Sequence, residues 1–247
     1  MNAIEIKNLV KKFGDKTAVN NISLEIKDGE LFGLLGINGA GKTTTLRILS
    51  CLSKATSGEA FIYGKSVSEN TKEVKQMINI STQETAVAPN LTVRENLIFI
   101  GGIYGYGKQE SIKKADKMIE DCSLSEVSGK KAKLLSGGWQ RRLSIAMALI
   151  TEPKVLFLDE PTLGLDVLAR RELWGIISKL KGKITIILTT HYLEEAEALS
   201  DRIAIMTGGC LRAVGTADEL KRLAGKDSFE DAFIEIAERS NGKEEAV

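Results

Sequence analysis

The chain has 247 residues, of which 43% are hydrophobic and 27% charged, which is ordinary for a globular protein with a sizeable core. Lysine and arginine number 34 against 33 aspartate and glutamate residues, and this net charge of +1 argues against a broad nucleic-acid-binding surface. The longest apolar stretches fall short of the roughly 20 residues that a membrane helix needs, and the start lacks a signal-peptide core. The three scattered cysteines are expected to be reduced, so we predict a cytosolic protein that reaches a membrane only through a partner chain.

The first third of the chain has the alternating pattern of strands. Residues 21–30 (NISLEIKDGE) alternate isoleucine and leucine with polar residues and end at a turn at Gly29. Residues 4–7 and 59–64 are similar short strands, so an antiparallel sheet is expected here. Residues 30–36 (ELFGLLG) are apolar on both faces, which is typical of a buried parallel strand.

A predominantly helical pattern runs from about residue 90 to 152. Thr92 and Glu95 have the spacing of a capping box ahead of an apolar stretch. Residues 110–122 form a polar amphipathic helix, and another helix is expected to start at Ser136. The sequence therefore predicts an all-helical subdomain inserted into an α/β frame.

The α/β frame resumes after Pro153. Residues 154–161 and 183–191 are continuous apolar runs that end in polar residues, as buried parallel strands do when a site lies at their carboxyl ends. An amphipathic crossover helix is predicted between them, at 168–180. Two strands, a helix and a disordered tail are then expected at 202–206, 210–215, 228–239 and 240–247.

A glycine-rich stretch, GINGAGKT at residues 36–43, fits G-x-x-x-x-G-K-[ST] and lies between a buried strand and a helix predicted at 43–52. Its glycines let backbone N–H groups surround an anion, and the helix N-terminus adds partial positive charge. Lys42 can reach the β- and γ-phosphates of a nucleoside triphosphate, and Thr43 can place its hydroxyl on Mg²⁺. The residues assigned to nucleotide binding here are Gly36, Ile37, Asn38, Gly39, Ala40, Gly41, Lys42, Thr43 and Thr44, and Lys42 is also assigned to catalysis.

Polar residues after two other strands complete a catalytic set. Asp159 ends a buried strand, where it can hold Mg²⁺, and the adjacent Glu160 can orient and polarise an attacking water, which favours hydrolysis. His191, the only histidine, follows another buried strand and can donate a hydrogen bond to a γ-phosphate oxygen. Taken alone, Gln83 is an ordinary polar residue, and Phe13 fits packing as well as stacking on a base.

A second phosphate cradle is indicated by LLSGGWQRR at residues 134–142, where a serine and two glycines open a helix. Together with the other motifs, in this order, it resembles the ATP-binding cassette family over essentially the whole chain. The corresponding parts are GINGAGKT for Walker A, Gln83 for the Q-loop, LSGGWQRR for the signature motif, VLFLDEP for Walker B, GLD at 164–166 for the D-loop and TTH for the switch histidine.

The resemblance implies roles for individual residues. Phe13 would stack on adenine, Glu160 would be the catalytic base, and His191 would contact the γ-phosphate. Magnesium would be held by Thr43, Gln83 and Asp159. The cradle of Ser136, Gly137 and Gly138, with Asp166 of the D-loop, would serve ATP held by the Walker A loop of another subunit.

The fold expected is α/β, with a P-loop NTPase core around a mostly parallel sheet, an N-terminal antiparallel β subdomain and the inserted all-helical subdomain. Residues 1–225 would form the ATPase domain and 226–247 a C-terminal helix and tail. The resemblance implies ATP and Mg²⁺ as cofactors and a homodimer or heterodimer of ATPase subunits. It also implies separate transmembrane permease subunits, no nucleic-acid partner, and a peripheral location on the cytoplasmic face of the cell membrane.

The segments 187–220 and 229–239 resemble the cassettes of type-2 exporters, including the drug-resistance branch. The alternative is a soluble cassette ATPase of iron–sulfur assembly, DNA repair or translation, without coupling to transport. An inactive regulatory subunit is disfavoured because the charged catalytic residues are all present. Three residues depart from the family pattern without removing a charged group of this set: Ile37, Trp139 and Leu163.

Overall fold

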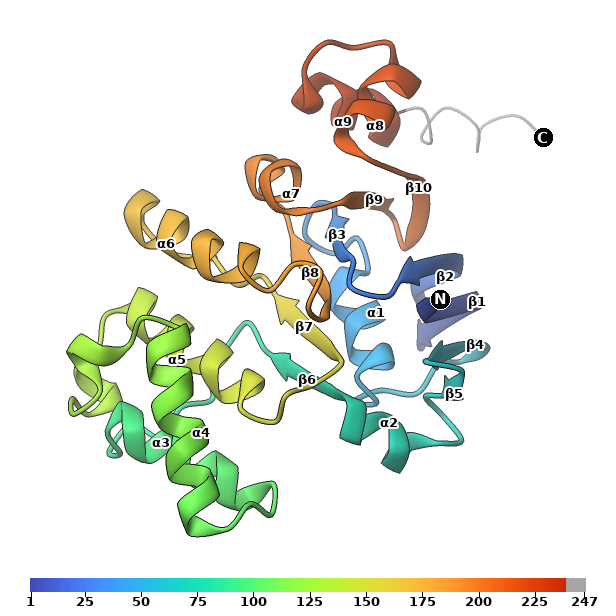
Figure 1. The fold of residues 1–247 in the computed structure, drawn as a ribbon. Coiled ribbons are helices and arrows are strands. Elements are labelled where there is room, and N and C mark those ends of the chain that lie inside the picture. Colours follow the sequence, from blue (N-terminus) through green and yellow to red (C-terminus); the bar gives the residue numbers. More distant parts are fainter. Residues whose placement is uncertain (239–247) are drawn as a thin grey trace. The chain divides into compact units, whose positions relative to one another are not determined.

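The computed structural model describes residues 1–238, and the contacts of the chain divide it into two compact units (Figure 1). The first unit comprises Met1–Met77 with the chain from Lys181 onward, and the second comprises Ile78–Leu180. The second unit extends beyond the helical segment predicted at about 90–152, because it also holds two strands and a further helix. The tail predicted to be disordered, 240–247, lies outside the described residues.

An antiparallel sheet in the first unit contains, in spatial order, β2 (Lys16–Lys27), β1 (Asn2–Phe13), β4 (Ser57–Ile62) and β5 (Lys65–Ser66). The apolar residues that alternate along β2 are buried, as the period of two requires. β1 pairs antiparallel with β2 on one side and β4 on the other, which confirms the predicted sheet. β1 is longer than the predicted strand because the pairing continues through several register shifts to Phe13.

A second, mostly parallel group of strands in this unit has the order β10 (Cys210–Gly215), β9 (Arg202–Thr207), β3 (Leu31–Leu35) and β8 (Thr185–Thr190). β3 is parallel to both β8 and β9, whereas β10 returns antiparallel to β9. Every residue of β3 and β8 is buried, which explains why both appear in the sequence as continuous apolar runs.

Helices of the first unit follow or flank these strands: α1 (Lys42–Leu49), α2 (Thr71–Met77), α7 (Leu193–Leu199), α8 (Ala217–Ala224) and α9 (Phe229–Glu238). α1 ends before the predicted limit because Cys51 adopts a left-handed φ of 58°. Phe229 and Ile236 of α9 are buried in a core cluster with Leu35 and Ile205, so the apolar stripe predicted for the C-terminal helix is confirmed.

The second unit contains two parallel strands and four α-helices among its residues: β6 (Ile78–Ser81), β7 (Val155–Asp159), α3 (Val93–Ile103), α4 (Lys108–Asp121), α5 (Gly137–Leu149) and α6 (Val167–Ser178). The capping box predicted at Thr92 and Glu95 is present, with the Thr92 hydroxyl accepting from Glu95 N at 3.1 Å and Glu95 Oε2 accepting from Thr92 N at 2.7 Å. Ser136 is the N-cap of α5, also as predicted.

Three helices were not predicted from the sequence: α2, α7 and α8. The first two have only seven residues each, which is too short for a convincing apolar stripe. The third starts with a capping box at Thr216 and Glu219, the same signal that identified α3.

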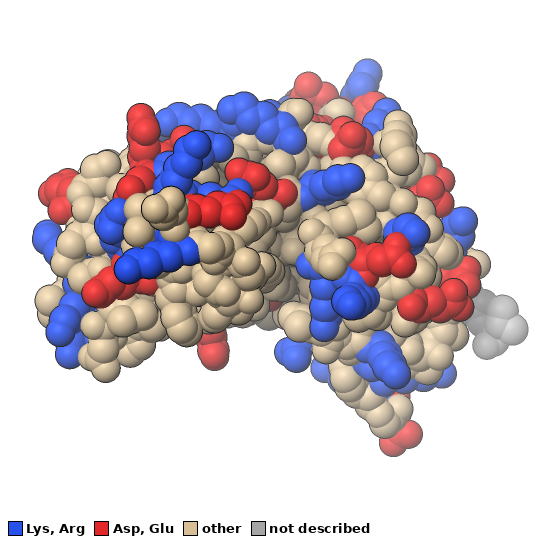
Figure 2. All heavy atoms as spheres, turned by 60° about the horizontal axis from the view of Figure 1, so that its bottom comes forward, with Lys and Arg blue, Asp and Glu red and all other residues tan. Residues whose placement is uncertain are grey.

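Acidic and basic side chains are interspersed over the face drawn in Figure 2. Among residues 1–238, none of the helices combines the length and the apolar character needed to cross a bilayer.

Candidate functional site

The glycine-rich loop of the first unit begins where β3 ends. Leu35 lies opposite Thr190 at the end of β8, and Gly36 N donates to Thr190 O at 3.4 Å. A Cβ on Gly36 would clash with the Met206 carbonyl oxygen of β9. Only glycine therefore fits at the point where the loop leaves β3 and passes the backbone of β9.

The end of the same loop caps α1 with backbone. Gly41 is the N-cap residue at φ 100°, and a Cβ there would lie 2.5 Å from Ala18 O. Its carbonyl accepts from both Thr45 N and Thr45 Oγ1, at 2.9 and 3.0 Å. The start of α1 carries the positive end of the helix dipole, so it is suited to bind an anion.

Lys42 directs its ammonium into the loop. Its Nζ donates to Gly36 O at 2.6 Å and to Ile37 O at 3.3 Å, and the residue is only 4% exposed. By contrast, a Cβ on Gly39 would meet no atom within 4 Å, so this side of the loop is open to a ligand. A positive charge beneath an open backbone cradle fits a phosphate group.

His191 and Phe13 belong to the first unit as well. His191 directly follows the Thr190 that accepts from Gly36, so it emerges at the same sheet edge as the loop. Its ring centroid lies 4.2 Å from that of Tyr192. Phe13 ends β1 with 55% of its surface exposed, and Lys11 Nζ lies 4.8 Å from its ring centroid.

The predicted carboxylates lie at the end of β7 in the second unit. Asp159 is 4% exposed and Glu160 8% exposed, and Glu160 has a left-handed φ of 46°. Ser81 of β6 lies opposite Leu158 of β7, so the chain carrying Gln83 leaves the sheet beside these carboxylates. A left-handed φ is uncommon for glutamate, and here it marks a tight turn directly after β7.

Arg141 of the signature motif, to which the sequence assigned no role, holds the backbone of the Q-loop. Its two terminal nitrogens donate to Thr82 O and Gln83 O, each at 2.6 Å, and the residue is buried. Asn96, also missed, is fully buried and exchanges hydrogen bonds with the backbone N and O of Ala88, at 2.8 and 3.1 Å. A charged or amide residue within an apolar helix face is the only sequence signal for either.

The signature motif starts α5, with Ser136 as an N-cap whose side chain makes no cap hydrogen bond. Ser136 and Gly137 are exposed, whereas Gly138 is buried. A Cβ on Gly138 would lie 3.0 Å from the Ala169 Cβ, so α5 and α6 approach closely at this point. Ser136 Oγ and the exposed helix start are thus available to a ligand.

The unusual Trp139 also has a defined partner. The guanidinium of Arg142 lies 4.4 Å from the Trp139 ring centroid and forms an ion pair with Glu172 of α6. Arg142 is almost fully buried, so its charge is compensated by one carboxylate and one aromatic face. Trp139 therefore helps to hold the signature helix against α6.

Asp166 of the D-loop caps α6, because its Oδ1 accepts from Ala169 N at 2.9 Å. Three predicted motifs of the second unit, the Q-loop, the signature motif and the D-loop, share one groove of about 400 Å³. The lining residues are Gln83, Glu84, Thr85, Gly137, Gln140, Arg141, Leu163, Gly164 and Leu165.

The family model described as "ABC transporter" matches residues 19–163, which is more than half of the chain. The chain belongs to the ABC transporter family. The match spans the Walker A, Q-loop, signature and Walker B segments described above.

Similar curated proteins have related names. The chain is 40% identical over 239 residues to the probable multidrug ABC transporter ATP-binding protein YbhF of Escherichia coli, covering 94% of this chain and 41% of that protein. It is also 40% identical over 240 residues to the doxorubicin resistance ATP-binding protein DrrA of Mycobacterium tuberculosis, covering 96% and 71% of the two chains. The predicted resemblance to the drug-resistance branch is thus confirmed, although the chain spans less than half of the first of these relatives.

Solved structures agree with the fold. One described as the ATP-binding subunit of an ABC transporter superposes with a TM-score of 0.83 at 26% identity, covering 95% of this chain and 99% of that one. A dimeric ATP-binding cassette in a post-hydrolysis state, bound to ADP and Pi, superposes with a TM-score of 0.76 at 29% identity, covering 86% and 98%. The predicted P-loop NTPase fold is confirmed.

Proposed function

We propose that this chain binds and hydrolyses ATP as the nucleotide-binding subunit of an ABC exporter. The observation that carries the proposal is the loop at Gly36–Thr43, where Lys42 is buried beneath an open backbone cradle at the start of α1. Relatives at 40% identity named as ATP-binding proteins of drug resistance support it.

The first unit would bind the triphosphate. The backbone of the loop and the positive end of the α1 dipole suit the phosphate oxygens, and Lys42 would add a positive charge near the β- and γ-phosphates. Exposed Phe13 would stack on adenine, and His191 would donate a hydrogen bond to the γ-phosphate. These assignments rest on geometry within this unit and on family membership.

The second unit would supply the hydrolytic groups. Glu160 would accept a proton from the attacking water, a role that suits a buried carboxylate held by a turn at the end of a strand. Family membership assigns Mg²⁺ to Thr43, Gln83 and Asp159, whose hydroxyl, amide and carboxylate oxygens are the donor types that this ion prefers. When bound, this ion would neutralise charge on the phosphates.

The second cradle indicates a partner copy. Ser136, Gly137 and Gly138 form an anion-binding helix start that is separate in sequence from the Lys42 loop, and Asp166 begins the helix packed against it. We infer that this cradle contacts ATP bound by another ATPase subunit, in a homodimer or heterodimer. The dimer would act on separate transmembrane permease subunits from the cytoplasmic face of the membrane.

Replacing Glu160 with glutamine tests the hydrolytic assignment. Glu160→Gln removes the proton acceptor but keeps the size of the side chain, so we expect turnover to fall at least about 100-fold while ATP binding persists. The matched control is Glu152→Gln, because Glu152 also has a left-handed φ, of 52°, and lies exposed in the same unit. Phosphate release and light scattering would show an inactive, ATP-bound dimer for Glu160→Gln alone. Equal turnover in both variants would remove Glu160 from this role.

Membrane coupling is tested by purification from native membranes with a tag on this chain. We expect a protein with several membrane spans to co-purify and to stimulate or restrain phosphate release. Recovery with ribosomes or nucleic acid instead would contradict the transporter assignment.

A further inference from the structure

The turn between β9 and β10, Gly208–Gly209, directly contacts the glycine-rich loop at Gly36–Thr43, which we call the phosphate loop. Gly209 N donates to Ala40 O at 3.2 Å, and Gly209 O accepts from Asn20 N of β2 at 2.8 Å. The turn thus connects the last residues of the loop to the antiparallel sheet. Both glycines lie within the segment 187–220, but neither was assigned a role from the sequence.

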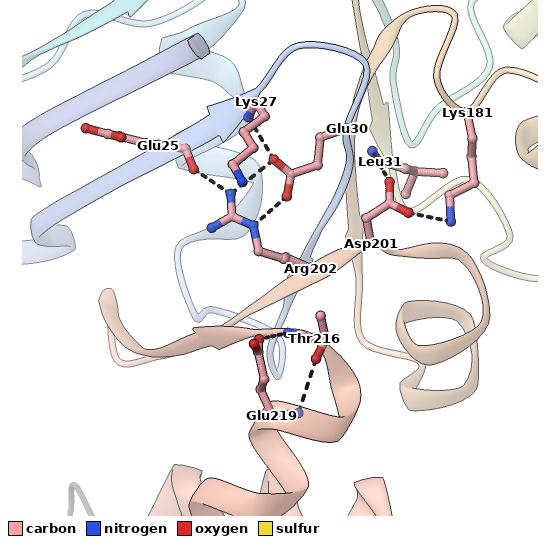
Figure 3. A network of polar contacts seen from close by, with 9 residues as sticks. All are labelled: Glu25, Lys27, Glu30, Leu31, Lys181, Asp201, Arg202, Thr216 and Glu219. Atoms are coloured by element: carbon pink, nitrogen blue, oxygen red, sulfur yellow. Dashed lines mark hydrogen bonds and ion pairs between the residues drawn. The ribbon is translucent and has the colours of Figure 1, made fainter. Parts of the chain in front are cut away.

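The hairpin that carries this turn is anchored at its other end, as Figure 3 shows. Arg202, the first residue of β9, donates to Glu30 Oε1 at 2.6 Å and Oε2 at 3.0 Å, and to Glu25 O at 2.8 Å. The neighbouring Asp201 accepts from Leu31 N at 2.8 Å and pairs with Lys181. These contacts join the start of β9 to the start of β3.

β9 and β3 then run parallel towards the phosphate loop. Phe32 lies opposite Arg202 and Leu35 opposite Ile205, so the anchored ends determine the register at the opposite ends. Gly36 leaves β3 against Met206 O, and the turn follows directly after β9. The phosphate loop is therefore bounded by β9 at its first residue and by the β9–β10 turn near its last.

We propose that the β9–β10 turn positions the phosphate loop for nucleotide, with Gly209 as the positioning residue. The Gly209 amide fixes the Ala40 carbonyl, one residue before the N-cap of α1. That bond determines where the N–H groups at the start of α1 lie. Gly209 touches no nucleotide itself, and the proposal rests on the proposed binding of ATP to this loop.

The two glycines of the turn differ in a way that can be tested. A Cβ on Gly209 would lie 3.0 Å from Ala18 O and 3.2 Å from Ala18 C, which forces the turn or β2 to shift. A Cβ on Gly208 would meet only the tip of Arg212, at 4.0 Å. Both glycines have left-handed φ values, of 80° and 57°, so alanine strains the backbone at either position. Only Gly209→Ala should also displace the loop.

The experiment compares Gly209→Ala with Gly208→Ala in the full chain by equilibrium binding of ATP and by thermal unfolding. We expect both variants to lose thermal stability, and Gly209→Ala to lose more because its Cβ also presses on Ala18. Gly209→Ala alone should raise the Kd for ATP by about tenfold, because the shift that its Cβ forces weakens the 3.2 Å bond to Ala40. Equal Kd values in the two variants would overturn the proposal. Absence of ATP binding by the wild-type chain would instead refute the proposed function.

A second measurement on the wild-type chain applies if Gly209→Ala fails to fold. Hydrogen exchange of the peptide covering residues 206–212 is followed with and without a non-hydrolysable ATP analogue and Mg²⁺. We expect the analogue to slow exchange at the Gly209 amide, because ordering the loop strengthens its bond to Ala40. Protection of the phosphate loop without any change at Gly209 would overturn the proposal.

Discussion

Arg141→Lys tests whether the signature helix holds the Q-loop. The arginine donates two hydrogen bonds of 2.6 Å to the carbonyls of Thr82 and Gln83, residues 59 and 58 positions away in the chain. Lysine keeps the charge but replaces two guanidinium nitrogens in a planar fork with one ammonium nitrogen, so we expect one of the two carbonyls to lose its partner. A hydrogen bond to a charged group contributes about 1.5–3 kcal/mol, so we expect the free energy of unfolding to fall by about 2 kcal/mol.

Urea denaturation measures this loss, and phosphate release measures its consequence for the proposed Mg²⁺ ligand Gln83. The matched control is Arg171→Lys, because Arg171 lies exposed on α6 and should tolerate the change within about 0.5 kcal/mol. Turnover should fall in Arg141→Lys beyond what its stability explains, since the loop that carries Gln83 is then loosened. Identical denaturation midpoints for the two variants would refute the assignment of Arg141.

Two further predictions concern α5 and α4. Glu172→Ala leaves the buried Arg142 without its carboxylate and should lower the free energy of unfolding by about 1–3 kcal/mol. In an Arg142→Met background the same substitution should lower it hardly at all, because the ion pair is already absent. Additive losses in the double variant would contradict the pairing. Burial raises the pKa of the Cys122 thiol to about 12, so at pH 8 only about one molecule in ten thousand carries the reactive thiolate. Maleimide mapping by mass spectrometry should therefore find Cys122 labelled in urea but protected in the native chain, and equally fast labelling in both would show that it is accessible.

Much of the fold follows from periodicity. Alternation identified β2, continuous apolar runs identified β3, β7 and β8, and the capping box at Thr92 identified α3. These signals are local, since each reports which face of one element is buried. Pairing of β3 with β8 and β9 joins residues more than a hundred positions apart, and no local pattern specifies which strands are neighbours.

The positions of candidate-site residues could be predicted from the sequence when all the groups concerned lie within one short motif. The Lys42 loop, the Ser136 helix start and the Asp159–Glu160 pair all stand at the ends of elements where the sequence places them. Arg141 lies within the signature motif, but nothing in the sequence marks the Thr82 and Gln83 carbonyls that it holds, so this positioning role could not be predicted.

Trp139 shows what a motif leaves out. Its place after the signature glycines marks it as a departure from the family pattern, and the sequence offers no reason for it. In the structure the Trp139 ring lies against the guanidinium of Arg142, which is buried and paired with Glu172. Because Glu172 is exposed, its carboxylate compensates the buried charge only in part, and the aromatic face contributes the rest. A glutamine at this position would expose the guanidinium to water and weaken the contact between α5 and α6. We therefore assign Trp139 to the packing of α5 against α6. Ser136, Gly137 and Gly138 remain the residues proposed to contact the nucleotide of the partner subunit.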